Sequence, residues 1–132
     1  MISEGKTFLV PSGPRGNHFF FVILGPIKAP GYGSDSQFVS VNATALKDGH
    51  PFDDACVLEP GDHPFIKHKR YIPYRHARLD SYMNLKNLVN KGVLIPNVDC
   101  SPDLLQRIID GATKSHHFYR EFKRLFYPTS NV

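Results

Sequence analysis

In the first half of the chain, short apolar runs alternate with segments rich in glycine and proline. Residues 18–24 (HFFFVIL) are apolar at consecutive positions, which predicts a central strand buried on both faces. Residues 38–43 (FVSVNA) alternate between apolar and polar, which predicts a second strand. Further strand candidates are residues 7–10 (TFLV), 55–58 (ACVL), 64–68 (PFIKH) and 71–74 (YIPY). Pro73 places the last of these at a sheet edge or at a strand end.

From residue 79 onwards the apolar positions follow a helical period. One broad arc predicts a helix over residues 79–91, and Gly92 suits the position after its end. A second helix is predicted to begin with Ser101 as N-cap and Pro102 at the first helical position. Its apolar stripe consists of Leu104, Leu105, Ile108, Ile109 and Ala112. The pattern resumes in residues 114–127 (KSHHFYREFKRLFY), a basic amphipathic helix whose apolar face we expect to pack on the core or on a partner.

Strands followed by helices, within a chain of 132 residues, predict one α+β domain. The sheet is expected to be small, strongly twisted and antiparallel, or a partly open β-barrel. The barrel would occupy about residues 5–78, and the C-terminal helices about residues 79–127. No internal repeat or change of composition marks a second domain.

Composition and charge narrow the function classes only slightly. Hydrophobic residues make up 41% and charged residues 21% of the chain, the balance of a globular protein. The net charge is +4, but residues 62–78 concentrate five Lys or Arg residues beside one acid, Asp62. There is no signal-peptide pattern and no apolar run as long as a membrane span. We therefore expect a soluble, cytoplasmic protein. Cys56 and Cys100 are expected to be buried thiols, with a single disulfide as the alternative.

Four segments together resemble one known family. They are Gly5 with residues 7–10 (TFLV), residues 13–24 (GPRGNHFFFVIL), residues 70–79 (RYIPYRHARL), and residues 85–92 (LKNLVNKG) followed by 101–112 (SPDLLQRIIDGA). Their order is similar to that in the MazF/PemK/Kid-like growth-inhibitor toxins, over roughly residues 5–112.

The resemblance implies an SH3-like barrel with a C-terminal helix. It also implies the toxin component of a type II toxin–antitoxin system, a metal-independent endoribonuclease that cleaves single-stranded RNA without a cofactor. Such toxins are usually homodimers and are silenced by a cognate antitoxin.

The chain departs from the family pattern at two places. His18 and Phe19 stand where the family commonly has Arg-Pro. The late strand of Kid-like members carries an arginine and an aspartate two residues apart, and our alignment places Pro73 and Arg75 there. On this alignment the usual carboxylate is missing, whereas Arg78 matches the basic residue at the end of the strand.

Metal-free RNA cleavage requires a base for the 2′-hydroxyl, an acid for the leaving oxygen and a cation for the developing charge. Histidine suits both proton transfers, and the arginine fork matches phosphate oxygens. The catalytic candidates are His18, His63, His68 and Arg75. The candidates for binding RNA or phosphate are Lys67, Arg70, Tyr71, Tyr74 and Arg78, because aromatic rings between cations are typical of single-strand binding.

Each histidine also has a structural interpretation. His63 lies in a Pro-flanked turn, where its ring would bond the backbone. His68 would share a strand face with Ile66 at the core edge, and the alternative role of His18 is to cap its strand. No His or Cys spacing is typical of a metal site. The alternative to the nuclease, favoured by the missing arginine–aspartate pair, is a non-catalytic barrel that binds nucleic acid or a protein partner. A third possibility is a structural domain without a nucleic-acid role.

The aromatic content suggests a partner. Residues 19–24 and the stripe at residues 118–126 hold more aromatic and aliphatic surface than one small core obviously needs. A basic rim around such a surface would attract an acidic, disordered peptide. We expect a homodimer whose surface at residues 62–78 is covered by an acidic antitoxin.

Overall fold

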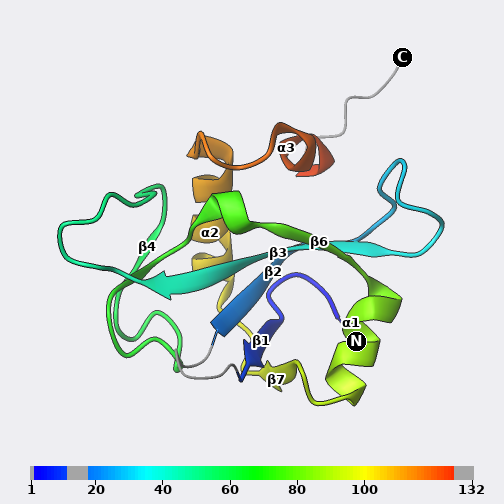
Figure 1. Cartoon of the computed structure of the whole chain (residues 1–132), viewed down its shortest axis with the longest axis horizontal. Coiled ribbons are helices and arrows are strands. Elements are labelled where there is room, and N and C mark those ends of the chain that lie inside the picture. Colours follow the sequence, from blue (N-terminus) through cyan, green and yellow to red (C-terminus); the bar gives the residue numbers. More distant parts are fainter. Residues whose placement is uncertain (1, 12–17, 127–132) are drawn as a thin grey trace.

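The structure is a computed structural model that describes residues 2–11 and 18–126 (Figure 1). In chain order its elements are β1 (Thr7–Val10), β2 (His18–Ile27), β3 (Gln37–Ala45), β4 (Val57–Leu58), β5 (Arg70–Tyr71), the 3-10 helix η1 (Tyr74–His76), β6 (Arg78–Ser81), α1 (Tyr82–Asn90), β7 (Ile95–Asn97), α2 (Pro102–Lys114) and α3 (Arg120–Phe126). None of the helices in the described ranges has the length and apolar character needed to cross a membrane.

The strands form one antiparallel sheet in the order β4-β5-β3-β2-β1-β7, and β6 also pairs with β3. The α+β class is thereby confirmed. Within the part of the chain that the structure describes, the terminal strands β4 and β7 do not pair. The sheet is therefore not closed into a barrel. The expectation that all strands precede the helices is also wrong, because β7 lies between α1 and α2.

One edge of β3 pairs with two different strands. Its first half, Gln37–Ser40, pairs with β6, which runs beside it in Figure 1, and its end, Thr44 and Ala45, pairs with β5. Helix η1 connects β5 to β6 along this edge, where residues 71–74 were predicted to form a strand. Pro73 explains the difference, because it lacks the N–H that a strand would need and precedes η1 as its N-cap residue.

Two other predicted strands are also revised. Residues 64–68 form a turn and an irregular segment instead of a strand. Only Val57 and Leu58 of the predicted strand at residues 55–58 pair, as β4. The glycine-bearing turn of residues 13–17, used in the family comparison, lies outside the described residues.

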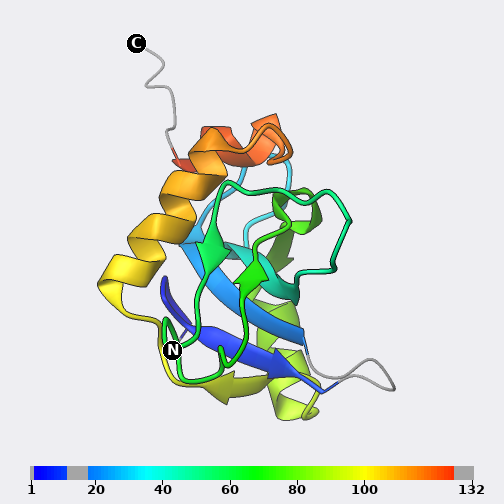
Figure 2. The same ribbon diagram turned by 90° about the vertical axis from the view of Figure 1, so that its left-hand side faces the viewer.

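The central strand β2 separates two apolar clusters, as its sequence predicted. Phe19, Phe21 and Ile23 point into the main core, whereas Val22 packs on the opposite face in a smaller cluster near α1. Helix α2 covers the main core (Figure 2) with Leu104, Ile108 and Ala112. Within the predicted run, Phe20 and Leu24 are only half-buried and His18 is exposed.

The helix signals account for α2 better than for its neighbours. The Ser101 hydroxyl accepts a hydrogen bond from the Leu104 N–H at 3.1 Å, and Pro102 opens the helix, as predicted. Helix α1 begins at Tyr82 instead of residue 79, because Leu79 pairs with Val39 in the sheet. Gly92 follows α1 with a φ of 75°, the left-handed conformation that glycine favours.

The predicted single helix over residues 114–127 is wrong. Helix α2 ends at Lys114, and Ser115 adopts an extended conformation with a ψ of 130°. The Ser115 hydroxyl donates to Asp53 Oδ2 at 2.6 Å, a contact 62 residues apart that holds the chain in its turn. Phe118 and Phe122 are buried against the main core, so the apolar face of this segment packs within the chain.

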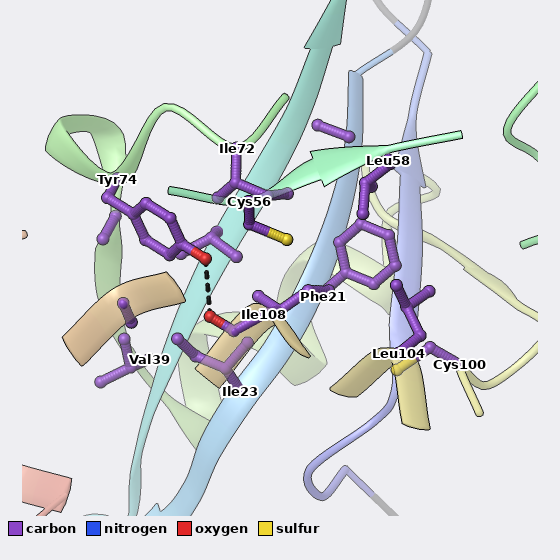
Figure 3. Close-up of a cluster of buried hydrophobic side chains, with 14 of the residues drawn as sticks. Phe21, Ile23, Val39, Cys56, Leu58, Ile72, Tyr74, Cys100, Leu104 and Ile108 are labelled. Atoms are coloured by element: carbon purple, nitrogen blue, oxygen red, sulfur yellow. Dashed lines mark hydrogen bonds between the residues drawn. The ribbon is translucent and has the colours of Figure 1, made fainter. Parts of the chain in front are cut away.

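Tyr74 anchors η1 to α2 (Figure 3). Its hydroxyl donates to the Ile108 carbonyl at 2.6 Å, and its side chain is fully buried. Gly111 permits this approach, because a Cβ there would lie 2.3 Å from the Tyr74 Oη. The anchor fixes the position of the next two residues, Arg75 and His76.

Both cysteines are free and buried, as predicted, so they form no disulfide with each other.

Candidate functional site

A groove of about 400 Å³ lies on the sheet face that α2 does not cover. Its lining combines an apolar floor with polar side chains, and consists of Phe8, Val10, His18, Phe20, Val22, Ser40, Asn42, His76, Arg78, Asp80, Leu85, Leu88, Val93 and Leu94. Alternate residues of a strand point to one face of the sheet. Each strand therefore contributes every second residue to the lining of the groove.

The strand register places these side chains in rows. Phe8 lies opposite Phe20, which lies opposite Asn42. In the next row Val22 lies opposite Ser40, and Ser40 lies opposite Arg78. The floor is therefore apolar beneath β1 and β2 and becomes polar towards β3 and β6.

Arg78 and Asp80 form the polar rim on β6. Arg78 Nη2 lies 3.3 Å from Asp80 Oδ1, and Asn84 Nδ2 from α1 donates to the same oxygen at 3.0 Å. The Arg78 side chain is 55% exposed, whereas that of Asp80 is only 11% exposed. The guanidinium can thus meet a ligand while the carboxylate is held in place beneath it.

The two ends of the groove are well separated. His18 precedes Val22 by four residues on β2, a distance of roughly 13 Å along the strand. Arg78 lies two strands away from Val22, roughly 10 Å across the sheet. His18 and Arg78 therefore lie at different ends of the groove. His76, two residues before Arg78, is the histidine nearest to the Arg78–Asp80 pair in sequence.

The alignment of Pro73 and Arg75 to the family's late strand is not supported by the fold. Neither residue lies on a strand, and the strand that pairs with the start of β3 begins at Arg78. In this strand an arginine and an aspartate, Arg78 and Asp80, stand two residues apart and face the same groove. The sequence analysis missed Asp80 and His76. His76, Arg78 and Asp80 are spaced two residues apart, which places their side chains on one face of an extended segment. A predicted strand that began at residue 78 instead of 71 would have pointed to them.

His63 does not reach the groove. It is 2% exposed, its Nε2 lies 2.6 Å from the Val98 carbonyl oxygen, and its Nδ1 accepts from the Phe65 N–H at 3.0 Å. The ring therefore carries its proton on Nε2 and packs against Phe19, with ring centroids 4.8 Å apart. Both nitrogens are engaged by backbone, which agrees with the structural interpretation and removes His63 from the proton-transfer candidates.

Tyr74 cannot stack on a base as the sequence analysis expected, because it is fully buried. Burial and the neighbouring Cys56 raise the pKa of its hydroxyl, which therefore acts as a donor.

The remaining basic residues of the segment 62–78 do not line the groove. Lys67 and His68 are exposed on the loop before β5. The Arg70 guanidinium lies 5.4 Å from the Phe65 ring centroid, a cation–π contact. Arg75 and Tyr71 line a separate cavity. The basic residues of the segment 62–78 therefore do not all line one cavity.

Among residues 2–11 and 18–126, no three His, Cys, Asp or Glu side chains come together in a group that could hold a metal ion.

Comparisons with known proteins add no relative: no family model matches the chain, and neither curated proteins nor solved structures yielded a match.

Proposed function

We propose that the chain is a metal-independent endoribonuclease that cleaves single-stranded RNA in the groove on the sheet face that α2 does not cover, as the cytoplasmic toxin of a type II toxin–antitoxin system. The observation that carries the proposal is the pair Arg78 and Asp80, two residues apart on one strand and lining the groove with His76. This is the arrangement that the family resemblance implies. The open sheet would then be a partly opened variant of the SH3-like barrel.

The groove offers the groups that the reaction needs. Asp80 accepts the proton of a 2′-hydroxyl as its oxygen attacks the adjacent phosphorus, which forms a 2′,3′-cyclic phosphate. Arg78 neutralises the charge that develops on the phosphoryl oxygens. Protonated His76 gives a proton to the departing 5′-oxygen as its bond to phosphorus breaks. His18, at the far end, contacts a different nucleotide of the strand.

We further propose that the toxin is a homodimer silenced by an acidic antitoxin. Support comes from the groove, which combines the half-buried Phe20 on its apolar floor with the exposed Arg78 on its rim. An acidic peptide with apolar anchors complements this surface. The aromatic excess no longer supports a partner, because both predicted aromatic stripes largely fill the two cores of one chain.

The second candidate is a non-catalytic module that binds nucleic acid or a protein through the same groove. Asp80 favours it, because one of its oxygens already accepts hydrogen bonds from both Arg78 and Asn84. A carboxylate held in this way could serve only to orient Arg78.

A panel of single-stranded RNAs incubated with the purified protein in EDTA separates the two functions. The nuclease yields fragments that end in a 2′,3′-cyclic phosphate, and its expression alone arrests growth. RNA that stays intact but binds with an affinity that falls steeply with salt establishes the binding module and overturns the nuclease.

A further inference from the structure

A second cavity, of about 190 Å³, borders the segment that runs from β5 into η1. It is lined by Pro51, Phe52, Asp53, Tyr71, Pro73, Arg75 and His117, and we refer to it as the aromatic slot. It is smaller than the pockets that enclose drug-sized ligands, so it suits a single base or ring.

The slot presents aromatic faces that the fold does not use. Phe52 is 42% exposed, and its ring centroid lies 5.2 Å from that of Tyr71, with the planes inclined by 51°. A planar base can stack on the Phe52 face and contact the Tyr71 ring. Such stacking is how single-strand binding proteins hold successive bases.

The slot also presents a cation. Arg75 is exposed, and among the described residues no hydrogen bond or ion pair engages its guanidinium. His117 lines the slot as well, and it also lines an adjoining surface with Arg120 and Lys123. An unpaired guanidinium beside an aromatic face matches a nucleotide, which combines a phosphate with a base.

The walls of the slot are held in place before any ligand binds. Asp53 Oδ1 accepts from the Ala55 N–H at 3.1 Å, and its Oδ2 accepts from the Ser115 hydroxyl. The same hydroxyl oxygen accepts from the His117 N–H at 3.1 Å. Both oxygens of Asp53 are therefore turned into the protein, which lessens their repulsion of a phosphate.

The slot and the groove are neighbours in the chain. Arg75 lines the slot and His76, the next residue, lines the groove. We propose that the aromatic slot is a nucleotide subsite, in which a base stacks on Phe52 and Tyr71 while its phosphate binds Arg75 and His117. A single strand that leaves the groove would pass over η1 into it. The path of the strand rests on the proposed function, whereas the binding of a nucleotide in the slot does not.

Two probes test the subsite and its source of ligand. Adenosine 5′-monophosphate is titrated into the full chain while the aromatic NMR signals of Phe52 and Tyr71 are followed. A 2′-O-methyl RNA of about twelve nucleotides, long enough for groove and slot together, measures binding without cleavage.

The variants are Phe52→Ala and Arg75→Ala. Their matched controls are Tyr32→Ala, at an exposed tyrosine outside both cavities, and Arg124→Ala, at an exposed arginine outside them.

We expect the mononucleotide to shift both signals, and Arg75→Ala but not Arg124→Ala to abolish the shift. Phe52→Ala should weaken binding of the long RNA roughly tenfold relative to Tyr32→Ala. Unmoved Phe52 and Tyr71 signals would overturn the subsite, whether or not the protein cleaves RNA. If the mononucleotide shifts both signals but Phe52→Ala binds the long RNA as tightly as Tyr32→Ala does, the slot binds free nucleotides and the proposed path of the strand is wrong.

Discussion

Arg78 Nη2 and Asp80 Oδ1 lie 3.3 Å apart on alternate residues of β6, at the polar rim of the groove. The pair joins a side chain that is 55% exposed to one that is 11% exposed. An ion pair with one exposed member contributes at most about 1 kcal/mol to folding. Folding therefore gives little reason for this arrangement, whereas the proposed binding and cleavage of a phosphodiester would use both members.

The Tyr74 anchor makes a prediction about stability. Tyr74→Phe removes the hydroxyl that donates to the Ile108 carbonyl, and should lower the free energy of unfolding by about 1 to 2 kcal/mol. Urea denaturation followed by circular dichroism measures the loss. Tyr119→Phe is the matched control, because Tyr119 is 46% exposed and its hydroxyl makes no hydrogen bond within the described residues. Equal stabilities of the two variants would show that the anchor contributes nothing.

Gly111 should not tolerate alanine, although alanine normally stabilises a helix by about 1 kcal/mol relative to glycine. The added Cβ would lie 2.3 Å from Tyr74 Oη and 2.9 Å from Cys56 Cβ, both inside a packed core. We expect Gly111→Ala to lower the free energy of unfolding by roughly 1 to 3 kcal/mol.

The double variant Tyr74→Phe/Gly111→Ala is the control for the steric clash between the added Cβ and the Tyr74 hydroxyl. Because Tyr74→Phe removes the nearest atom, Gly111→Ala should be less destabilising in that background than in the wild type. Strictly additive effects in this double-mutant cycle would refute the steric explanation.

The ion pair between Asp62 and Arg107 predicts a dependence of stability on pH. Burial raises the pKa of Asp62, but hydrogen bonds from Arg107 and from the Glu59 N–H, with the charge of Arg107, outweigh it and hold the pKa below its usual value of 3.8. A depressed folded-state pKa stabilises the fold above the unfolded-state pKa, and this contribution is lost as the pH falls through the folded-state pKa.

Asp62→Asn should therefore lower stability at pH 7 by at most about 1 kcal/mol, because the pair is partly exposed. The difference from the wild type should shrink as the pH falls below about 3.8. Denaturation curves at several pH values provide the measurement, with Asp48→Asn as a control at an exposed position. A difference that persists unchanged into strong acid would contradict the ion pair.

The two thiols should be unreactive in the folded protein. Burial and, secondarily, the charge of Asp99 raise the pKa of the Cys100 thiol to about 11, and burial raises that of Cys56. The thiolate is the reactive form, and at pH 8 little of it is present in either site. Ellman's reagent should label both thiols rapidly in denaturant and neither in the native protein. Fast labelling of a native thiol would show that this part of the core opens.

Local signals predicted some elements well and others poorly. Ser101 and Pro102 fixed the start of α2, and the continuous apolar run identified β2, because caps and periodicity act within a few residues. The end of α2 depends on Ser115 and Asp53, which are 62 residues apart. The orientation of the His63 ring depends on its contact with the Val98 carbonyl oxygen, 35 residues away.

The candidate site was harder to predict than the helices. The start of β6 is set by its pairing with β3. The strand predicted from the sequence lay a few residues too early, so the alignment compared Pro73 and Arg75 with the family's pair instead of Arg78 and Asp80, which stand on β6. The polar residues of the groove come from separate strands, so no short motif in the sequence contains them all.

The rate of RNA cleavage by Asp80→Asn in EDTA tests the proposed site most directly. Asp99→Asn is the matched control, because Asp99 also pairs with a cation, Lys6 at 3.7 Å, but is 71% exposed and outside the groove. Loss of the proposed base should lower the rate by about a hundredfold or more, while Asp99→Asn cleaves at the wild-type rate. Cleavage by Asp80→Asn at the wild-type rate would contradict the assignment of the reaction to this groove.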